Sequence, residues 1–275
     1  MSSEMNTVSV IIPTWNRSPL LLRAVKSVLT QSYSPQEILV CDDGSTDDSK
    51  NKIMKLNNER IKWIAGDHTG LPAAVRNWGL KVARGEWIAF LDSDDEWLPD
   101  KLEKQLRVLT KSKLQACSTN AFRYENNIKI EKIINSKSKL ISYSDLIINN
   151  QIISSSVIIH RSLIDNVGYF PTEDKLKAIE DYAYWLRIAA RSDFAFICEP
   201  LVKYHNDPSS SIRYISERDP IKQKIYVLQS FIDWSNRNNI PEQYIDSALK
   251  ELNKIRNMTI KIDIRSALSR IFSIN

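Results

Sequence analysis

Aspartates gather where short apolar runs of this sequence end. Asp42 and Asp43 belong to a polar stretch at the end of the run Glu37–Cys41, and the stretch Asp92–Asp95 (Asp-Ser-Asp-Asp) follows the run Glu86–Leu91. Carboxylates brought to one place repel one another unless a divalent cation or the hydroxyls of a ligand lie among them. An Asp-x-Asp pair on a tight turn can hold Mg²⁺ or Mn²⁺ and leave positions open for phosphates. The alternative is that these aspartates only cap helices and form Asx turns.

The elements around these aspartates are predicted to be strands and helices in alternation. Continuous apolar strands separated by helices predict an α/β fold, with a mostly parallel sheet covered by helices on both faces. In such sheets ligands bind at the carboxyl ends of the strands, where Pro13–Arg17 would join both aspartate clusters. After Gly44 a helix is expected, with Ser45 or Thr46 at its N-cap. The predicted strands are Val8–Ile12, Glu37–Cys41, Ile61–Ala65 and Glu86–Leu91, and the predicted helices are Leu20–Leu29, Ala73–Ala83 and Pro99–Leu109.

The middle of the chain has a less regular pattern. Glu125–Lys139 is polar and rich in lysine and asparagine, and we expect an exposed hairpin or loop there. Ala178–Arg191 has the periodicity of a helix. The predicted strands of this part are Gln115–Phe122, Ser154–His160 and Phe194–Cys198, the last of them ended by Pro200.

Composition limits the classes of protein to consider. Of the 275 residues 43% are hydrophobic and 26% charged, which indicates a globular protein with a sizeable core. No apolar run approaches the roughly 18 residues of a membrane span, and the N-terminus has no signal-peptide pattern. Cys41, Cys117 and Cys198 stand singly, which excludes a disulfide scaffold and fits a reducing cytoplasm.

The net charge of +5 is unevenly distributed. Residues 221–275 hold nine Lys/Arg against five Asp/Glu, so this tail carries +4 and the remainder about +1. The body is therefore not expected to bind nucleic acid. The tail is predicted to be helical from Ile215, with a break near Asn236–Pro241 and apolar stripes. Such helices can pack on the body or a second copy, or contact a membrane peripherally.

Several segments together resemble the inverting family-2 glycosyltransferases of the GT-A fold. The resemblance covers about residues 7–212 and follows the order of the family's motifs. It implies a catalytic domain over residues 1–214, with a nucleotide-binding half to about 112, an acceptor-binding half from about 113, and a helical extension over 215–275. The matching segments are VSVIIPTWNR, SVLTQSY, EILVCDDGSTDDS, AAVRNWGLKVARGEWIAFLDSDDEWLPDKLEKQL and IEDYAYWLRIAAR.

This resemblance also implies roles for individual residues in binding the donor. Asp43 matches the aspartate that accepts a hydrogen bond from the base, and uracil N3–H is such a donor. Arg76 matches an arginine that can neutralise diphosphate charge. A Mn²⁺ or Mg²⁺ ion would be held by Asp94 and Asp95, with His205 as a further ligand. The other residues that match the nucleotide site are Pro13, Thr14, Asn16, Arg17, Asp92 and Ser93.

Glu180 and Asp181 match the acidic pair of the family at the start of a helix. Inverting transfer needs one base on the acceptor side of the anomeric carbon. The match assigns that role to Asp181, with Glu180 as the neighbour that orients it or raises its basicity. Asp181 could instead be only a helix N-terminal charge.

The resemblance implies transfer of a sugar from a nucleoside diphosphate sugar, with UDP the expected nucleotide, to a glycan or lipid-linked glycan in bacterial surface polysaccharide synthesis. The expected location is the cytoplasm, with contact at the inner face of the membrane as an option. One alternative is a sugar-1-phosphate nucleotidyltransferase, which would want a glycine-rich loop that Pro13–Arg17 lacks. Another is a non-catalytic nucleotide- or glycan-binding module, against which the intact Asp94 and Asp181 argue.

Overall fold

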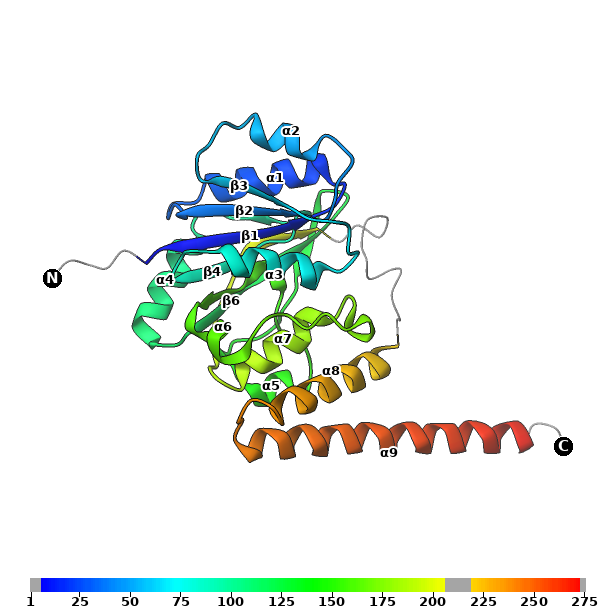
Figure 1. The fold of residues 1–275 in the computed structure, drawn as a ribbon. Helices are drawn as coiled ribbons and strands as arrows, with labels where there is room; N and C mark the ends of the chain where they lie inside the picture. The colour runs from blue at the N-terminus through cyan, green and yellow to red at the C-terminus, as the bar shows by residue number, and fades with distance from the viewer. Residues whose placement is uncertain (1–5, 206–218, 273–275) are drawn as a thin grey trace.

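The computed structural model describes residues 6–205 and 219–272, with side chains of the last helix described as far as Thr259. In this part of the chain one ten-stranded sheet carries helices on both faces (Figure 1). The strands are β1 Val8–Thr14, β2 Glu37–Asp42, β3 Ile61–Ala65, β4 Trp87–Phe90, β5 Glu96–Trp97, β6 Ala116–Glu125, β7 Ile128–Lys132, β8 Leu140–Ile141, β9 Ile158–His160 and β10 Phe194–His205. The helices are α1 Ser18–Leu29, α2 Ser49–Met54, α3 Pro72–Val82, α4 Lys101–Ser112, α5 Tyr143–Leu146, α6 Ser162–Val167, α7 Glu180–Ala189, α8 Pro220–Ser235 and α9 Glu242–Phe272, with 3₁₀ turns η1 Ser154–Ser156 and η2 Asp174–Leu176.

The sheet is parallel in its first half and mixed in its second. Its strand order is β3-β2-β1-β4-β9-β6-β10-β5, with β7 beside β6 and β8 beside β10. The strands β3, β2, β1 and β4 run parallel, as their apolar runs predicted. β9 lies antiparallel between β4 and β6. At the carboxyl edge of the parallel half, Thr14 of β1 pairs in register with Asp42 of β2, so the polar strand ends meet as predicted.

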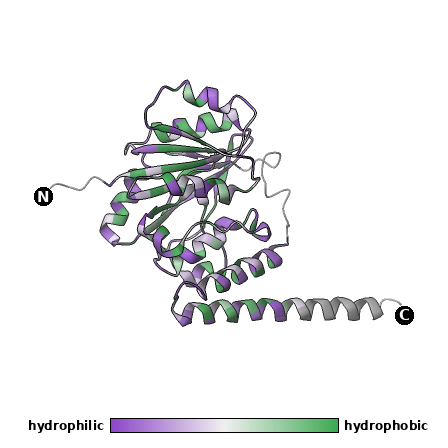
Figure 2. Ribbon diagram, viewed as in Figure 1, coloured by the Kyte–Doolittle hydropathy of each residue, from purple (hydrophilic) through white to green (hydrophobic). Residues whose placement is uncertain are grey.

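An apolar cluster on each face of the sheet holds the helices in place. In β1, Ile11 belongs to one cluster while Val10 and Ile12 belong to the other, because successive side chains of a strand point to opposite faces. α3 and α7 pack in the cluster of Ile11, and α1 and α4 pack in the other. Figure 2 shows the green, hydrophobic residues concentrated in these central strands.

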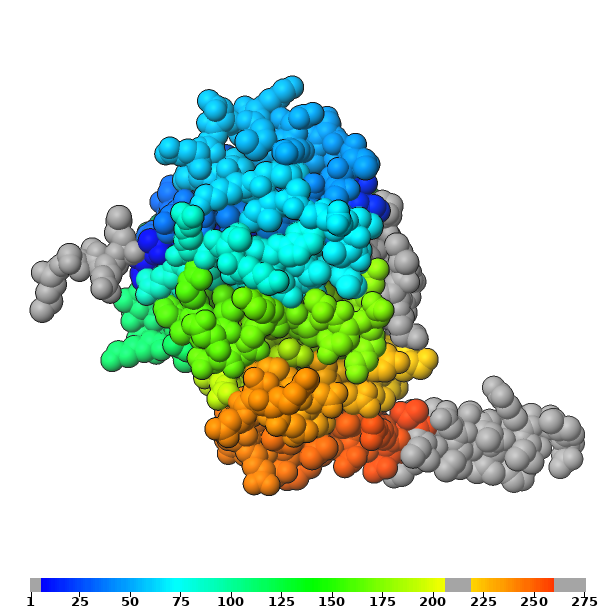
Figure 3. Space-filling view, in the orientation of Figure 1, coloured from blue at the N-terminus to red at the C-terminus, as the bar shows by residue number. Residues whose placement is uncertain are grey.

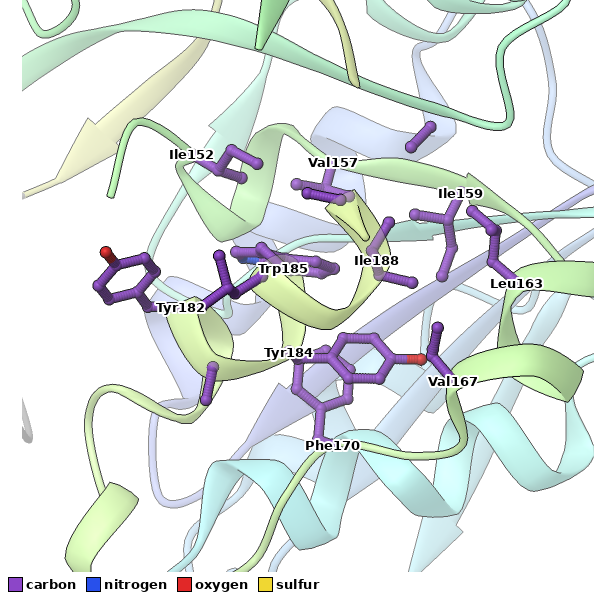
Figure 4. Close-up of a cluster of buried hydrophobic side chains, with 14 of the residues drawn as sticks. Ile152, Val157, Ile159, Leu163, Val167, Phe170, Tyr182, Tyr184, Trp185 and Ile188 are labelled. Carbon is purple, nitrogen blue, oxygen red and sulfur yellow. The ribbon is translucent and has the colours of Figure 1, made fainter. Parts of the chain in front are cut away.

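Aromatic packing fixes the position of α7, which is buried along its whole length. Trp185 has no exposed surface and meets Phe90 and Phe170 edge-on. Tyr184 stacks on Phe170 with ring centroids 4.0 Å apart (Figure 4). Such aromatic pairs add to the free energy of burial and define ring orientations. The start of α7, with Glu180 and Asp181, is therefore held firmly relative to the sheet.

The helix expected after Gly44 begins later than predicted. α2 starts at Ser49 with Asp48 at its N-cap, so the prediction of Ser45 or Thr46 in that position is wrong. The reason is that these residues form a turn tied to the first strand. Asn16 N donates to Ser45 Oγ at 2.8 Å, and Ser45 N donates to Asp42 Oδ1 at 3.0 Å.

The predicted strands of the second half need two corrections. Residues 154–156 form the turn η1, and only residues 158–160 are a strand. β10 does not end before Pro200 but runs to His205. Register shifts on both sides of Pro200 mark a bulge, where a missing N–H is tolerated because the ladder is already interrupted. The expected hairpin in Glu125–Lys139 is confirmed in part, since β7 pairs antiparallel with β6.

The helices after residue 219 pack on the body of the protein. Val227, Leu228 and Phe231 of α8 are fully buried, and α8 lies against α7. Lys224 of α8 pairs with Glu251 of α9 at 2.5 Å, and α9 continues beyond the start of α8 (Figure 1). In the space-filling view the orange α8 and α9 form one end of the molecule (Figure 3). The later apolar residues of the predicted stripe, from Ile262 onward, lie outside the described side chains. None of the described helices combines the length and apolar character that crossing a membrane requires.

Lys101 is expected to make stability depend on pH. Its ammonium is fully buried, lies 3.9 Å from the centroid of the Trp97 ring and donates to Gln105 Oε1 at 2.8 Å. Burial lowers the pKa of Lys101 to about 7. Above that pH the unfolded chain still binds a proton that the folded chain has lost, so the free energy of unfolding rises with pH. For one group the slope is at most about 1.4 kcal/mol per pH unit.

The measurement is urea unfolding of wild type and Lys101→Met between pH 6 and pH 9. Wild type should gain stability relative to the variant as the pH rises above 7, because methionine has no proton to lose. Equal pH dependence in the two proteins would contradict a buried titrating Lys101.

Candidate active site

Three aspartates follow β4 in one loop, and each has a different partner. Asp92 Oδ1 accepts from Arg76 Nη2 at 2.7 Å, and Asp94 Oδ2 accepts from Arg17 Nη1 at 2.6 Å. Asp95 is 1% exposed and accepts from Ser155 Oγ at 2.5 Å and from the backbone N–H of His205 at 2.9 Å. The loop therefore contacts the N-cap residue of α1 as well as α3, η1 and β10.

This aspartate loop is electrostatically strained. Desolvation and the nearby Asp92 carboxylate raise the pKa of Asp94, against the lowering effect of Arg17. Burial, with repulsion from Asp94 and Asp92, raises the pKa of Asp95 well above its ordinary value. Burial and mutual repulsion thus disfavour the ionised forms of Asp94 and Asp95 although Arg17 contacts Asp94, and a bound cation would favour those forms.

Arg76 joins the aspartate loop to α7. Its guanidinium is buried between two carboxylates, donating to Asp92 and, through Nη1, to Glu180 Oε1 at 2.9 Å. Although burial opposes its charge, Asp92 and Glu180 raise the pKa of Arg76. Burial raises the pKa of the Glu180 carboxyl in spite of Arg76, and Glu180 Oε2 has no hydrogen-bond partner among the described residues. Arg76, the residue predicted to neutralise the diphosphate, thus lies between Asp92 of the aspartate loop and Glu180 of α7.

Asp181 lies at the start of α7 and is 8% exposed. Its Oδ2 accepts from Ser154 Oγ at 2.7 Å, and its Oδ1 accepts from the N–H of Tyr182 at 2.7 Å. Each carboxylate oxygen retains capacity for one more hydrogen bond. The side chain is thus oriented by the turn η1 rather than by Glu180, the neighbour assigned from the sequence.

The end of β1 joins the loop after β2. Thr14 is buried at the strand end, after Pro13, and Asn16 follows with a φ of 48°. Asn16 Oδ1 accepts from Thr46 N at 2.8 Å, so this amide holds the two loops together. Ser93 is buried within the aspartate loop. Four residues predicted to bind nucleotide therefore lie at the end of β1 and in the adjoining loops at the carboxyl edge.

Asp43 is already surrounded by donors. Its Oδ1 accepts from Thr69 N at 2.7 Å and from Thr69 Oγ1 at 2.8 Å, and its Oδ2 accepts from Gly70 N at 2.9 Å. His68 Nδ1 lies 3.0 Å from the same Oδ2. Asp43 thus organises the loop after β3 through both of its carboxylate oxygens.

Trp15 lies beside this loop and was not among the predicted site residues. It stacks on His68 with ring centroids 4.5 Å apart and an interplanar angle of 24°. Trp15 is 48% exposed, and no other tryptophan belongs to the exposed large hydrophobic residues of the described part of the chain. Its position inside the polar segment Pro13–Arg17 was the available signal.

His205 does not lie as expected for a metal ligand. Its ring Nε2 is 2.9 Å from Glu96 Oε1, and only its backbone N–H reaches Asp95. Glu96 also pairs with Arg23 and Lys203, so the ring of His205 belongs to this ion-pair group rather than to the aspartate loop. Within residues 6–205 and 219–272, as far as side chains are described, no three His, Cys, Asp or Glu residues are arranged as a metal-binding group.

Comparisons with known proteins agree with this architecture. A sequence model of glycosyl transferase family 2 matches residues 9–168. WfgD of Escherichia coli, a UDP-Glc:alpha-D-GlcNAc-diphosphoundecaprenol beta-1,3-glucosyltransferase, is 35% identical over 208 residues, which are 74% of this chain and 78% of the relative. WfaP of the same organism, which has the same activity in its name, is 36% identical over 187 residues, 68% of this chain and 72% of the relative.

Solved structures share the fold at low identity. TarS residues 1–349 of S. aureus, in complex with UDP-GlcNAc, has a TM-score of 0.74 at 21% identity, over 90% of this chain and 72% of that chain. The mannosyltransferase PcManGT of Pyrobaculum calidifontis, in complex with GDP-Man and Mn²⁺, has a TM-score of 0.61 at 16% identity, over 97% and 81%. These likenesses concern the fold alone and confirm the predicted α/β fold of GT-A type. With the family match and the relatives above, they show that the chain belongs to glycosyl transferase family 2 and is a glycosyltransferase.

Proposed function

We propose that this protein transfers a sugar from a UDP-sugar to a hydroxyl of a lipid-linked glycan, with inversion at the anomeric carbon and a divalent cation bound. The observation that carries the proposal is the chain of contacts from the aspartate loop through Arg76 to Glu180, beside an oriented Asp181. The groups that would bind the charged diphosphate of the donor and the group that would accept the proton of the acceptor hydroxyl thus lie next to one another. The names of the E. coli relatives, with UDP-Glc as donor and a diphosphoundecaprenol acceptor, support the substrate classes.

The reaction we propose is a single displacement. The acceptor oxygen forms a bond to the anomeric carbon while the bond from that carbon to the diphosphate breaks. Asp181 takes the proton of the acceptor hydroxyl, using the capacity that Ser154 and the Tyr182 N–H leave free on its oxygens. Arg76 and Arg17, which pair with Asp92 and Asp94 of the aspartate loop, would supply positive charge to the departing diphosphate. Attack opposite to the leaving group inverts the anomeric centre.

The donor set of the aspartate loop suits a hard divalent cation. Mg²⁺ and Mn²⁺ favour carboxylate oxygens, and burial together with the neighbouring carboxylates raises the pKa of both Asp94 and Asp95. These residues would hold the ion, and it would offset charge on the diphosphate. His205 would contribute through its backbone contact to Asp95 rather than through its ring.

Removal of the cation is expected to abolish transfer, and Mn²⁺ or Mg²⁺ should restore it. Asp94→Asn should lose the response because an amide is a poor ligand for these ions. The measurement is transfer in EDTA and after Mn²⁺ addition, together with thermal unfolding of wild type and variant with UDP and Mn²⁺. Asp48→Asn, at an exposed aspartate paired with Lys52, is the control. Full activity in EDTA would rule out a metal requirement.

A panel of nucleotide sugars tests the donor and the reaction class together. UDP-glucose, UDP-GlcNAc and GDP-mannose would be compared for protection against thermal unfolding and for slow hydrolysis. The proposal requires protection by UDP-sugars and release of UDP. Synthesis of a UDP-sugar from UTP and a sugar-1-phosphate would instead indicate a nucleotidyltransferase. Binding without hydrolysis or transfer would indicate a non-catalytic module.

We place the protein at the cytoplasmic face of the membrane, through the extension over residues 215–275 that follows the catalytic domain 1–214. Residues 221–275 carry a charge of +4, and basic residues beside apolar ones favour anionic lipid. A lipid-linked acceptor would be reached from that surface. Cosedimentation with vesicles containing anionic lipid, but not with neutral vesicles, is the expected result. A dimer in solution without vesicle binding would favour contact between two copies.

A further inference from the structure

We propose that two serines of η1 are positioning residues with separate duties, Ser154 for the base and Ser155 for the aspartate loop. This inference rests on the proposed function. The three consecutive serines Ser154–Ser156 are buried, yet their hydroxyls point to three different partners. Because the turn joins groups from β4, α4 and α7, it sets the distance between the two halves of the site.

Ser154 orients Asp181. Its Oγ donates to Asp181 Oδ2 at 2.7 Å, with both side chains more than nine-tenths buried. The Tyr182 N–H holds the other oxygen, so the carboxylate plane is fixed from two sides. A base fixed in this way keeps a free lone pair in a constant direction, which proton transfer from a positioned hydroxyl requires.

Ser155 secures the aspartate loop at both of its ends. Its Oγ donates to Asp95 Oδ2 at 2.5 Å and accepts from the backbone N–H of Asp92 at 3.1 Å. Its carbonyl accepts from Trp97 Nε1 at 2.7 Å, just beyond the loop. Without this hydroxyl, the His205 N–H would be the one hydrogen-bond donor left to the buried Asp95 among the described residues, and the Asp92 N–H would lose its acceptor in η1.

Ser156 provides a matched control within the same turn. Its Oγ donates to the carbonyl of Ile153 at 2.7 Å, which closes the turn on itself and touches no site residue. Its own carbonyl accepts from Gln105 Nε2 at 2.8 Å, so α4 supports η1 through the backbone. Substitution by alanine at this position removes a buried hydroxyl of the same kind without disturbing either proposed duty.

The experiment compares Ser154→Ala, Ser155→Ala and Ser156→Ala by steady-state transfer and by thermal unfolding. Loss of a group that orients a catalytic ligand or base typically costs about 10–100-fold. We expect Ser154→Ala to lower kcat by roughly that factor with little change in the donor KM. Ser155→Ala should raise the donor KM and the Mn²⁺ concentration for half-maximal rate by about 10-fold or more. Ser156→Ala should change neither.

Rescue separates positioning from general destabilisation. Ser154→Thr keeps the hydroxyl and should recover most of kcat, whereas Ser154→Cys, of similar size but a weak donor, should not. If Ser154→Ala and Ser156→Ala give the same kcat and KM, or if Ser154→Cys is as active as wild type, the inference is wrong. These results need a wild type that transfers sugar. A wild type inactive with every donor would instead overturn the proposed function.

Discussion

Asp181→Asn is expected to retain donor binding and to lose transfer by roughly 10²–10⁴-fold, the range for removing a general base. The fold should persist because an asparagine amide can occupy the same space between Ser154 Oγ and the Tyr182 N–H, with the serine hydroxyl turned to accept where needed. Donor binding should persist because the nucleotide loops and the aspartate loop lie on other elements. The measurement is the initial rate of transfer together with UDP protection in thermal unfolding.

Two controls accompany this variant. Glu180→Gln should be milder, because Glu180 contacts Arg76 rather than the proposed acceptor position. Asp165→Asn, on the exposed side of α6, should leave the rate unchanged. Product analysis gives an independent check, since a single displacement converts an α-linked donor into a β-linked product. Near-normal transfer by Asp181→Asn, or a retained linkage from wild type, would remove Asp181 from the role of base.

Arg76→Met is expected to destabilise the protein by about 3–5 kcal/mol, the usual cost of leaving a buried charge without its partner. The variant leaves the carboxylate of Glu180 without its positively charged partner. Glu180 is 5% exposed and already has one oxygen without a partner among the described residues. Asp92 also loses its guanidinium contact but is less buried. Urea unfolding at neutral pH measures the effect. Arg107→Met, at an exposed position of α4, should stay within about 0.5 kcal/mol of wild type.

The pH dependence of this variant has a definite sign. Burial already raises the pKa of Glu180 in the presence of Arg76, and loss of Arg76 should raise it further. A folded carboxyl with a raised pKa binds a proton that the unfolded chain has released, so acid favours the folded state. The deficit of Arg76→Met should therefore shrink between pH 7 and pH 5. The double variant with Glu180→Gln should recover much of the loss at pH 7, and no recovery would contradict the explanation.

Much of the site could be predicted because polar residues at the carboxyl ends of parallel strands must lie at the same edge of the sheet. Thr14 and Asp42 are the last residues of the apolar strands β1 and β2, and three aspartates follow β4. They meet at one edge because these strands are parallel. The resemblance to the family added the order of the motifs. None of this required knowledge of a side chain's partner.

The remaining features depend on contacts between distant segments. Ser155 meets Asp95 across 60 positions, and Asp43 meets Thr69 across 26, so neither pair leaves a local pattern. The ring of His205 turns to Glu96 because β10 pairs with β5, a pairing hidden by the bulge at Pro200. Local propensity predicted that the strand ends at Pro200, but in the structure β10 pairs with β6 on both sides of that proline.

The position of β10 also bears on how the protein folds. The contact from His205 to Asp95 closes a loop of 110 positions, and that from Arg76 to Glu180 closes one of 104. Loop closure costs chain entropy that grows with length, so such contacts follow local ones in time. A growing chain can therefore form the parallel strands β1, β2 and β3 early, yet it must emerge as far as His205 before the aspartate loop has all its partners. Until then the acidic loop has its charges in place without the backbone N–H that β10 supplies.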